Sequence, residues 1–322
     1  MRKSICAAAA LVAAAMLFSA APAAAQTGPD LLLRPLLSEN ETWESRGDAL
    51  IFPEASATGG NDYQMSIYTY QGRFREQRER LIPRIGWDLS YFNLDSEIPL
   101  LDQDLVDVSA AVGLELGTYY DWRAGFTVGL GYAGNAPFGE SSAWYGKATL
   151  LLGRKLDART QLALVVDYDG NRSIWPDVPL PGFAYIHEFD PALSYTIGIP
   201  VSSVTWKPNE SFRLDVTWVI VDTFEARAEY KMSPNWTAYG ALEQRQEAFS
   251  VDDVPGRDRL LFQQRRAEAG VRWTPWEHTS LFVAGGYAFG GEWSTGWDQR
   301  ESDLVADISD QPYVRFGFER RF

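Results

Sequence analysis

The sequence has 322 residues, with 43 acidic and 29 basic side chains and a formal net charge of −14 at pH 7. A chain this acidic repels polyanions, which excludes nucleic acid as a partner. Aromatic residues make up 14% of the sequence and charged residues 22%, so many rings must lie where they are neither fully buried nor fully hydrated.

Residues 1–25 predict a cleaved secretory signal peptide. Two basic residues near the N-terminus precede an alanine-rich apolar run, and small residues at 23–25 form the cleavage site before Gln26. The run is too short and too rich in alanine for a membrane-spanning helix. The single cysteine, Cys6, lies inside this segment, so the chain from Gln26 offers no thiol for a disulfide, a metal site or a nucleophile.

The next segment, residues 26–60, shows no steady hydrophobic period. Packed strands and helices repeat their apolar positions every two or every 3 to 4 residues. We therefore expect residues 26–60 to form a periplasmic extension or a plug, and residues 61–322 to form the main domain.

From residue 61 onward the apolar residues recur with a period of two. The stretch "WRAGFTVGLGY" at 122–132 places large residues on one face of an extended chain and small or polar residues on the other. About 13 such segments follow one another, including 193–206 taken as one strand. They are roughly 8 to 15 residues long, whereas soluble strands average ~5–6 and membrane-crossing strands need ~9–11.

The connections between these segments alternate in length. Long acidic links such as 169–190 and 291–311 alternate with short ones such as "MSPN" and "KPNES"; the exception is the short link near Val221 and Asp222. Outer-membrane barrels have short periplasmic turns and longer outer loops. The alternation therefore favours a membrane barrel over a soluble meander.

A closed barrel is the only way for an extended chain to cross lipid, because every backbone polar group must be paired inside the protein. We predict an all-β fold, a transmembrane antiparallel up-and-down β-barrel. Single-chain bacterial barrels have an even number of strands. The segments then predict about 12 strands, or 14 if residues 49–52 begin another.

The last ten residues, "YVRFGFERRF", have an aromatic residue at the very end. Phe316, Phe318 and Phe322 share one face of the strand and resemble the sorting signal that outer-membrane assembly machinery recognises. Arg320 falls on the same face and departs from that pattern; near the membrane boundary its charge can reach the headgroups.

Charged residues take the polar face of several strands, which would be the lumen side of a barrel. Both signs are interleaved, and a wide pore selective for one sign should carry a ring of one charge. The mixture favours a narrow aqueous channel or a lumen closed by ion pairs. The lumen-facing candidates are Arg84, Asp88, Glu115, Arg123, Asp215, Arg227, Glu229, Arg272, Arg315 and Glu319.

An outer-membrane hydrolase is the alternative function. Only two histidines exist, and neither lies in the spacing of a nucleophile with its base. His187, in a predicted outer loop with Glu188, Asp190 and Asp177, is the one place where a catalytic group could form. We assign no catalytic, cofactor-binding or metal residue, and expect no cofactor and no enzyme activity.

Two stretches carry a family resemblance: "LPGFAYIHEFDPALSYTIGIPVSSVTWKPNESFRLDV" at 180–216 and "FEARAEYKMSPNWTAYGALE" at 224–243. With the terminal strand, they resemble an uncharacterised family, a domain of unknown function, of bacterial outer-membrane β-barrel proteins. The resemblance implies the fold and the location, and it implies no activity.

The sequence as a whole predicts a bacterial outer-membrane barrel that acts as a small passive channel or as a structural surface barrel. The expected partners are outer-membrane lipid, lipopolysaccharide, periplasmic chaperones and the barrel-assembly machinery. A soluble periplasmic protein with two packed sheets remains a third alternative, in which the apolar faces would form a core.

Overall fold

The structure, a computed structural model, describes residues 27–28, 30–33, 43–75, 83–135, 138–219 and 223–321. The predicted signal peptide and Phe322 lie outside these residues. Within the described residues, no helix has the length and apolar content to span a membrane.

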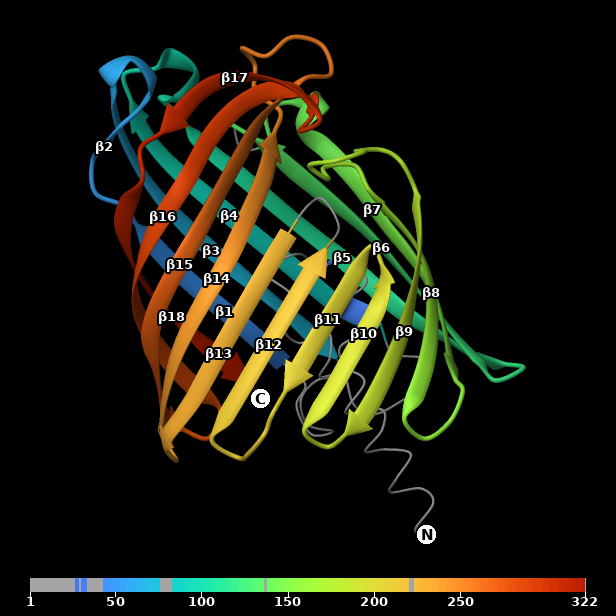
Figure 1. The fold of residues 1–322 in the computed structure, drawn as a ribbon. Helices are drawn as coiled ribbons and strands as arrows, with labels where there is room; N and C mark the ends of the chain where they lie inside the picture. Colours follow the sequence, from blue (N-terminus) through green and yellow to red (C-terminus); the bar gives the residue numbers. More distant parts are fainter. Residues whose placement is uncertain are drawn as a thin grey trace.

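The described residues form one short α-helix, three 3₁₀ turns and a large antiparallel sheet (Figure 1). The helix is α2 (Asp30–Leu33), and the 3₁₀ turns are Thr58–Gly60, Pro99–Leu101 and Ser141–Ala143. The strands are β1 (Trp43–Ile51), β2 (Ala55–Ser56), β3 (Asp62–Arg75), β4 (Arg84–Ser96), β5 (Asp104–Tyr119), β6 (Trp122–Gly134), β7 (Trp144–Lys155), β8 (Thr160–Asp169), β9 (Leu180–Asp190), β10 (Leu193–Ile199), β11 (Val201–Trp206), β12 (Phe212–Val219), β13 (Thr223–Ser233), β14 (Trp236–Phe249), β15 (Arg259–Trp276), β16 (Thr279–Asp298), β17 (Glu301–Ile308) and β18 (Gln311–Arg321).

The sheet closes on itself. Each wall strand pairs antiparallel with the next, and β1 completes the circle by pairing with β18 on one side and β3 on the other. β17 and β18 pair with successive parts of β16 and act as one interrupted wall strand. In the same way, β1 and the two-residue β2 pair with successive parts of β3 and count as one. The barrel therefore has 16 strands, and the prediction of 12 or 14 is wrong.

Three segments account for the difference in strand number. Residues 43–51, grouped by the sequence with the N-terminal extension, form wall strand β1. Residues 180–190, assigned to a long outer loop, form β9. The segment 193–206 is two strands, β10 and β11, which reverse direction at Pro200.

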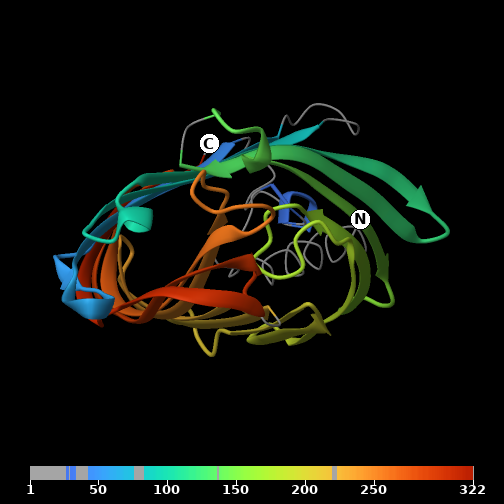
Figure 2. The ribbon, with the colours of Figure 1, turned by 90° about the horizontal axis from the view of Figure 1, so that it is seen from above.

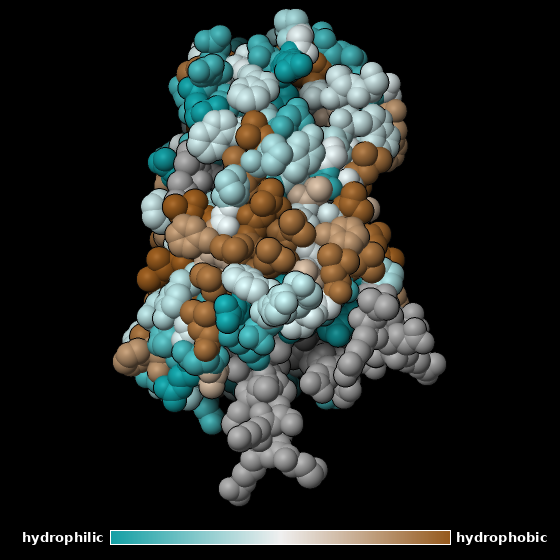
Figure 3. Space-filling view, turned by 90° about the vertical axis from the view of Figure 1, so that its right-hand side faces the viewer, coloured by the Kyte–Doolittle hydropathy of each residue, from teal (hydrophilic) through white to brown (hydrophobic). Residues whose placement is uncertain are grey.

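The outer face of the wall carries a belt of apolar side chains. Val128, Leu150, Phe183, Ile197 and Val314 are each 45% exposed or more. Figure 3 shows the belt as a band across the middle of the side where β7, β8 and β9 lie, with polar surface above and below. A soluble protein rarely exposes so large a contiguous apolar surface, so the belt argues against the soluble two-sheet alternative.

Most of the short turns lie at one end of the barrel, where β1 begins and β18 ends; we call this the inner end and the opposite one the outer end. The tight turn at Pro200 between β10 and β11 lies toward the outer end. Near the outer end the wall reverses its polarity. Along β4, Asn93 and Asp95 are exposed, whereas Phe92 and Leu94, which alternate with them, are buried in the interior. This is the pattern of a strand in water with a core on its inner face.

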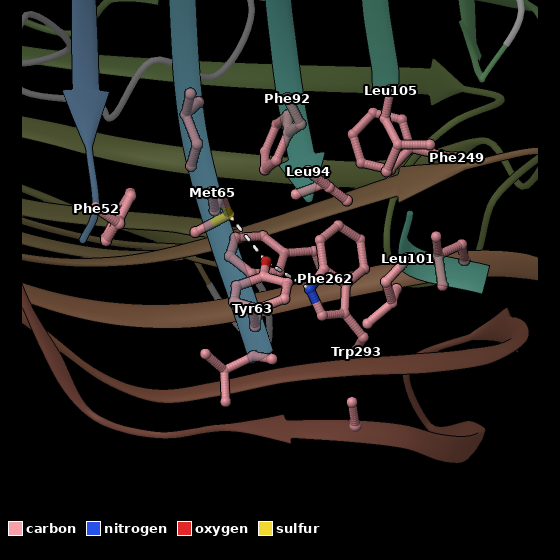
Figure 4. Close-up of a cluster of buried hydrophobic side chains, with 14 of the residues drawn as sticks. Phe52, Tyr63, Met65, Phe92, Leu94, Leu101, Leu105, Phe249, Phe262 and Trp293 are labelled. Carbon is pink, nitrogen blue, oxygen red and sulfur yellow. Dashed lines mark hydrogen bonds between the residues drawn. The ribbon is translucent and has the colours of Figure 1, made fainter. Parts of the chain in front are cut away.

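That core is an apolar cluster inside the outer half of the barrel (Figure 4). Phe92 of β4 contacts Phe249 of β14 and Phe262 of β15, with ring centroids 5.3 and 5.5 Å apart. The indole N–H of Trp293 donates to the Tyr63 hydroxyl at 3.0 Å. Because β4 and β14 are not neighbours in the wall, these contacts cross the interior and hold its two sides together.

The outer end of β14 leans across the barrel. The Ser250 N–H donates to the Ala133 carbonyl at 2.9 Å, and Ser250 forms a bridge with Gly134 at the end of β6. Seen from above, the orange end of β14 and the loop after it reach across the barrel toward the green wall strands (Figure 2). The interior is thereby divided into a packed side, between β14 and β5, and a second side bounded by β6 to β13.

Candidate functional site

The barrel interior is the candidate functional site, and an ion-pair network on its packed side centres on Arg315. This guanidinium, on β18, lies 3.0 Å from Asp48 of β1, 3.3 Å from Glu268 of β15 and 3.7 Å from Glu243 of β14. All four side chains point inward from different strands. Asp48 also accepts a hydrogen bond from Thr69 at 2.9 Å.

A second group of predicted residues continues this network toward the inner end. Arg272 lies 3.1 Å from Glu229 and 3.6 Å from Glu319. Glu229 also pairs with Arg227 at 2.8 Å, and the Arg227 guanidinium lies 4.1 Å from the Tyr239 ring centroid. Four of the ten lumen candidates thus meet in one cluster on β13, β15 and β18.

A third group lies on β4, β5 and β6, beside α2. Arg84 pairs with Glu115, which also pairs with Arg123 at 3.1 Å. Arg84 donates to the carbonyls of Leu31 and Leu32 at 3.1 and 2.8 Å, and Leu31 is fully buried. Arg84 therefore fixes the segment around α2 to the inside of the wall.

Asp88 and its surroundings occupy the middle of the interior, beneath the apolar cluster. Lys147 and Asp107 lie within electrostatic range of Asp88. The Tyr145 hydroxyl donates to Asp107 at 2.6 Å, and Lys147 lies 3.1 Å from Asp169. From the other side, Arg245 of β14 donates to Ser90 of β4 at 2.9 Å, which ties the two walls together across the lumen.

The opposite wall is nearly free of charge in its middle section. We define the neutral wall as the inward positions of β8 to β11 between their charged ends: Ala163, Val165, Gly182, Ala184, Thr196, Gly198, Ser203 and Thr205. Asp215, the remaining lumen candidate, borders this wall on β12, where it accepts from Thr205 at 2.7 Å and from Arg213 at 2.9 Å.

Three threonine hydroxyls on this side face the interior: Thr127 of β6, Thr196 of β10 and Thr217 of β12. Each residue is at most 3% exposed, and none of the three hydroxyls has a hydrogen-bond partner among the described residues. Register places Thr196 opposite Ser203, which in turn lies opposite Thr217, so hydroxyls from three strands form one row. Sequence reasoning followed the charged residues and missed this row, although its small inward residues follow the same period of two.

His187 does not lie where the hydrolase alternative requires it. It belongs to β9 near the inner end, on the outward face with Phe183 and Phe189, and hydrogen-bonds Thr160 at 3.0 Å. Asp177 lies in the link 170–179 at the outer end of the same strand. The described residues contain no group of three or more His, Cys, Asp or Glu side chains that could hold a metal ion.

Of the predicted assembly residues, the structure describes two. Phe316 and Phe318 point outward from β18 and are 51% and 38% exposed. The Phe318 ring covers Gly47 of β1, where an added Cβ would lie 2.8 Å from the ring. Phe322 lies outside the described residues.

Comparison with solved structures gives distant barrel matches. The TodX deltaS2S3 mutant monoaromatic hydrocarbon channel has 11% identity and a TM-score of 0.47, covering 91% of this chain and 92% of that one. An outer membrane channel from Pseudomonas putida F1 has 13% identity and a TM-score of 0.39, covering 89% and 96%. Omp33 of Acinetobacter baumannii has 8% identity and a TM-score of 0.36, covering 88% and 100%.

No protein-family model matches the chain, so membership of the uncharacterised family that the sequence resembles is not shown. No curated protein matches it either.

Proposed function

We propose that this protein spans the bacterial outer membrane as a non-enzymatic barrel and provides a narrow aqueous passage for small solutes along the neutral wall. The short-turn end, with Phe316, Phe318 and Phe322 as the assembly signal, faces the periplasm. Signal cleavage after residue 25, periplasmic chaperones and the barrel-assembly machinery bring it there, and lipid with lipopolysaccharide surrounds it.

The apolar belt supports the membrane placement. An exposed belt on a closed barrel is stable where acyl chains replace water, and a closed barrel leaves no backbone group unpaired in lipid. Above the belt, the inward-facing apolar cluster and the outward-facing Asn93 and Asp95 fit a part of the wall that stands in water.

The unpaired threonine hydroxyls carry the proposal of a passage. A buried hydroxyl without a hydrogen-bond partner costs about 1–3 kcal/mol, and three of them face the same side of the lumen. We infer that water entering this side of the barrel satisfies them. On the packed side, the described charged side chains pair with one another, and its buried atoms without a hydrogen-bond partner belong to charged or amide side chains such as Arg266, Gln264 and Gln311. The small, uncharged inward side chains of the neutral wall are therefore what favours a passage on that side.

The test is single-channel conductance of the protein in planar bilayers, with one lumen position changed. Gly153 of β7 lies next to Ala163 of the neutral wall and faces inward, and an added Cβ there meets nothing within 4 Å. We expect small, discrete conductance steps from the wild type and a reduction of at least about half from Gly153→Trp, because an indole fills much of a narrow passage.

Gly285→Trp is the matched control. Gly285 also has nothing within 4 Å of an added Cβ, but it lies on the outward face of β16 with Val283 and Tyr287. The conductance of Gly285→Trp should equal that of the wild type. A folded barrel without any conductance steps would reject the passage and leave the structural surface barrel as the function.

A further inference from the structure

The link between β8 and β9, residues 170–179, does not stand out into solvent. It begins and ends at the outer rim of the neutral wall and reaches inward to the ends of β14, β15 and β16 (Figure 2). Ser173 donates to Gln246 of β14 at 3.0 Å, and the Asn171 amide donates to the Ala248 carbonyl at 3.0 Å. The link therefore crosses the outer mouth of the second side of the barrel.

Arg259, at the start of β15, holds the first half of this link. Its guanidinium donates to the Asn171 side-chain oxygen at 3.1 Å and to the Arg172 carbonyl at 2.9 Å. It is anchored on its own side by the Trp297 carbonyl at 2.8 Å, and it is only 6% exposed. One buried cation thus joins the link to two strands of the opposite wall.

The end of β16 holds the second half. The Trp175 N–H donates to Asp298 at 3.3 Å, and the Arg300 guanidinium lies 4.6 Å from the Trp175 ring centroid. The Gln299 N–H donates to the Ser173 carbonyl at 3.1 Å. These contacts involve side chains and backbone, so the position of the link is set at several points.

The backbone of the link is strained in this position. Trp175 and Asp177 have φ values of 51° and 61°, in the left-handed region that non-glycine residues avoid. Such conformations are unfavourable for residues with a Cβ and persist only where surrounding contacts enforce them. The hydrogen bond from the Trp175 N–H to Asp298 supplies part of that enforcement, and Tyr168 of β8 donates to Asp177 at 2.8 Å. Loss of the contacts across the barrel therefore gives the first half of the strained segment a reason to move.

We propose that residues 170–179 form a lid over the outer mouth of the passage, latched across the barrel by Arg259 and Asp298. The lid would control the passage proposed above, so this inference rests on the proposed function. The latched lid is the closed state, and release of Arg259 lets the strained segment relax outward and opens the mouth.

A disulfide tests the closed state. Ser173 and Gln299 are joined by a backbone hydrogen bond, and the chain after the predicted signal has no cysteine of its own. In Ser173→Cys/Gln299→Cys, we expect oxidation to abolish most openings in single-channel records and reduction to restore them. Openings that persist unchanged in the oxidised protein would overturn the lid.

Arg259→Ala tests the latch. Its control is Arg257→Ala, at an exposed residue of the link just before β15. Arg259 makes two charge-assisted hydrogen bonds to the link, so the ratio of open to closed time should rise at least about tenfold in Arg259→Ala and stay unchanged in Arg257→Ala. An equal ratio in both variants contradicts the latch.

A labelling readout separates the lid from the passage. Thr196→Cys should react with a membrane-impermeant maleimide added outside cells, and faster when combined with Arg259→Ala than with Arg257→Ala. If Arg259→Ala speeds labelling but the barrel never conducts, the proposed function is rejected and the lid is supported. Equal labelling rates reject the lid, whatever the conductance.

Discussion

At the residue scale, Arg315 shows how far sequence reasoning reaches inside a barrel. The period of two places Arg315 on the lumen face, but its three carboxylate partners come from strands β1, β14 and β15, far away in sequence. Asp48 could not be found at all, because residues 43–51 do not show the large-and-small alternation of a wall strand. The alternation of residues along a strand predicts which side of the wall a charged side chain faces. Its partner is determined only when the barrel closes and brings distant strands together.

Removing Arg315 should be among the more destabilising changes in the wall. Arg315→Met leaves Asp48, Glu243 and Glu268 facing one another without their shared cation, and breaking a buried ion pair from one side costs about 3–5 kcal/mol. The free energy of unfolding, from urea titration of the barrel in lipid vesicles, measures the loss.

Arg154→Met is the matched control for Arg315→Met. Arg154 lies 3.8 Å from Asp121, with the side chains 43% and 81% exposed. Exposed pairs contribute about 0–1 kcal/mol, so this variant should unfold close to the wild type. Equal destabilisation by the two variants would show that the interior pairs are as hydrated as the surface ones.

At the scale of the element, the strands that sequence reasoning missed share a physical reason. In β1 the outward positions include Ser45, Gly47 and Ala49, because the neighbouring Phe318 ring covers that face. In β9, Pro181 and the acidic residues near its end give the sequence the composition of a loop. Between β10 and β11 the turn is a single residue, Pro200, so the sequence pattern predicts one strand where there are two.

The apolar belt on the outer face of the wall should not tolerate a charged side chain. Val283 of β16 is 49% exposed within the belt, and an arginine on the lipid face near the bilayer midplane costs about 2–4 kcal/mol in membrane barrels. Val283→Arg should therefore lower the free energy of unfolding in vesicles by about that amount. Folding yield and urea titration measure it.

Leu304→Arg serves as the comparison for Val283→Arg. Leu304 is 57% exposed on β17, beside the outer part of β16, above the belt. We expect a change of about 0–1 kcal/mol there, as at the interface or in water. If the two variants are equally tolerated, the belt does not lie in lipid.

At the scale of the whole molecule, one sheet carries two opposite polarities. In its middle it is apolar outside and polar inside, and toward the outer end it is polar outside and apolar inside. The all-β fold, the closed antiparallel barrel and the short inner turns follow from period and link length. The extra wall above the belt, the leaning end of β14 and the division of the interior depend on contacts between distant strands, which no local pattern carries.

The measurement that tests the account most directly compares thiol block at the two sides of the lumen. Single cysteines at Thr217, in the hydroxyl row, and at Ser90, bound by Arg245 on the packed side, are introduced into a chain without other cysteines after its signal. A small charged methanethiosulfonate reagent is then added during single-channel recording. We expect rapid, reducible block of Thr217→Cys and no effect on Ser90→Cys; block at Ser90→Cys alone, or at neither site in a conducting barrel, would contradict a passage along the neutral wall.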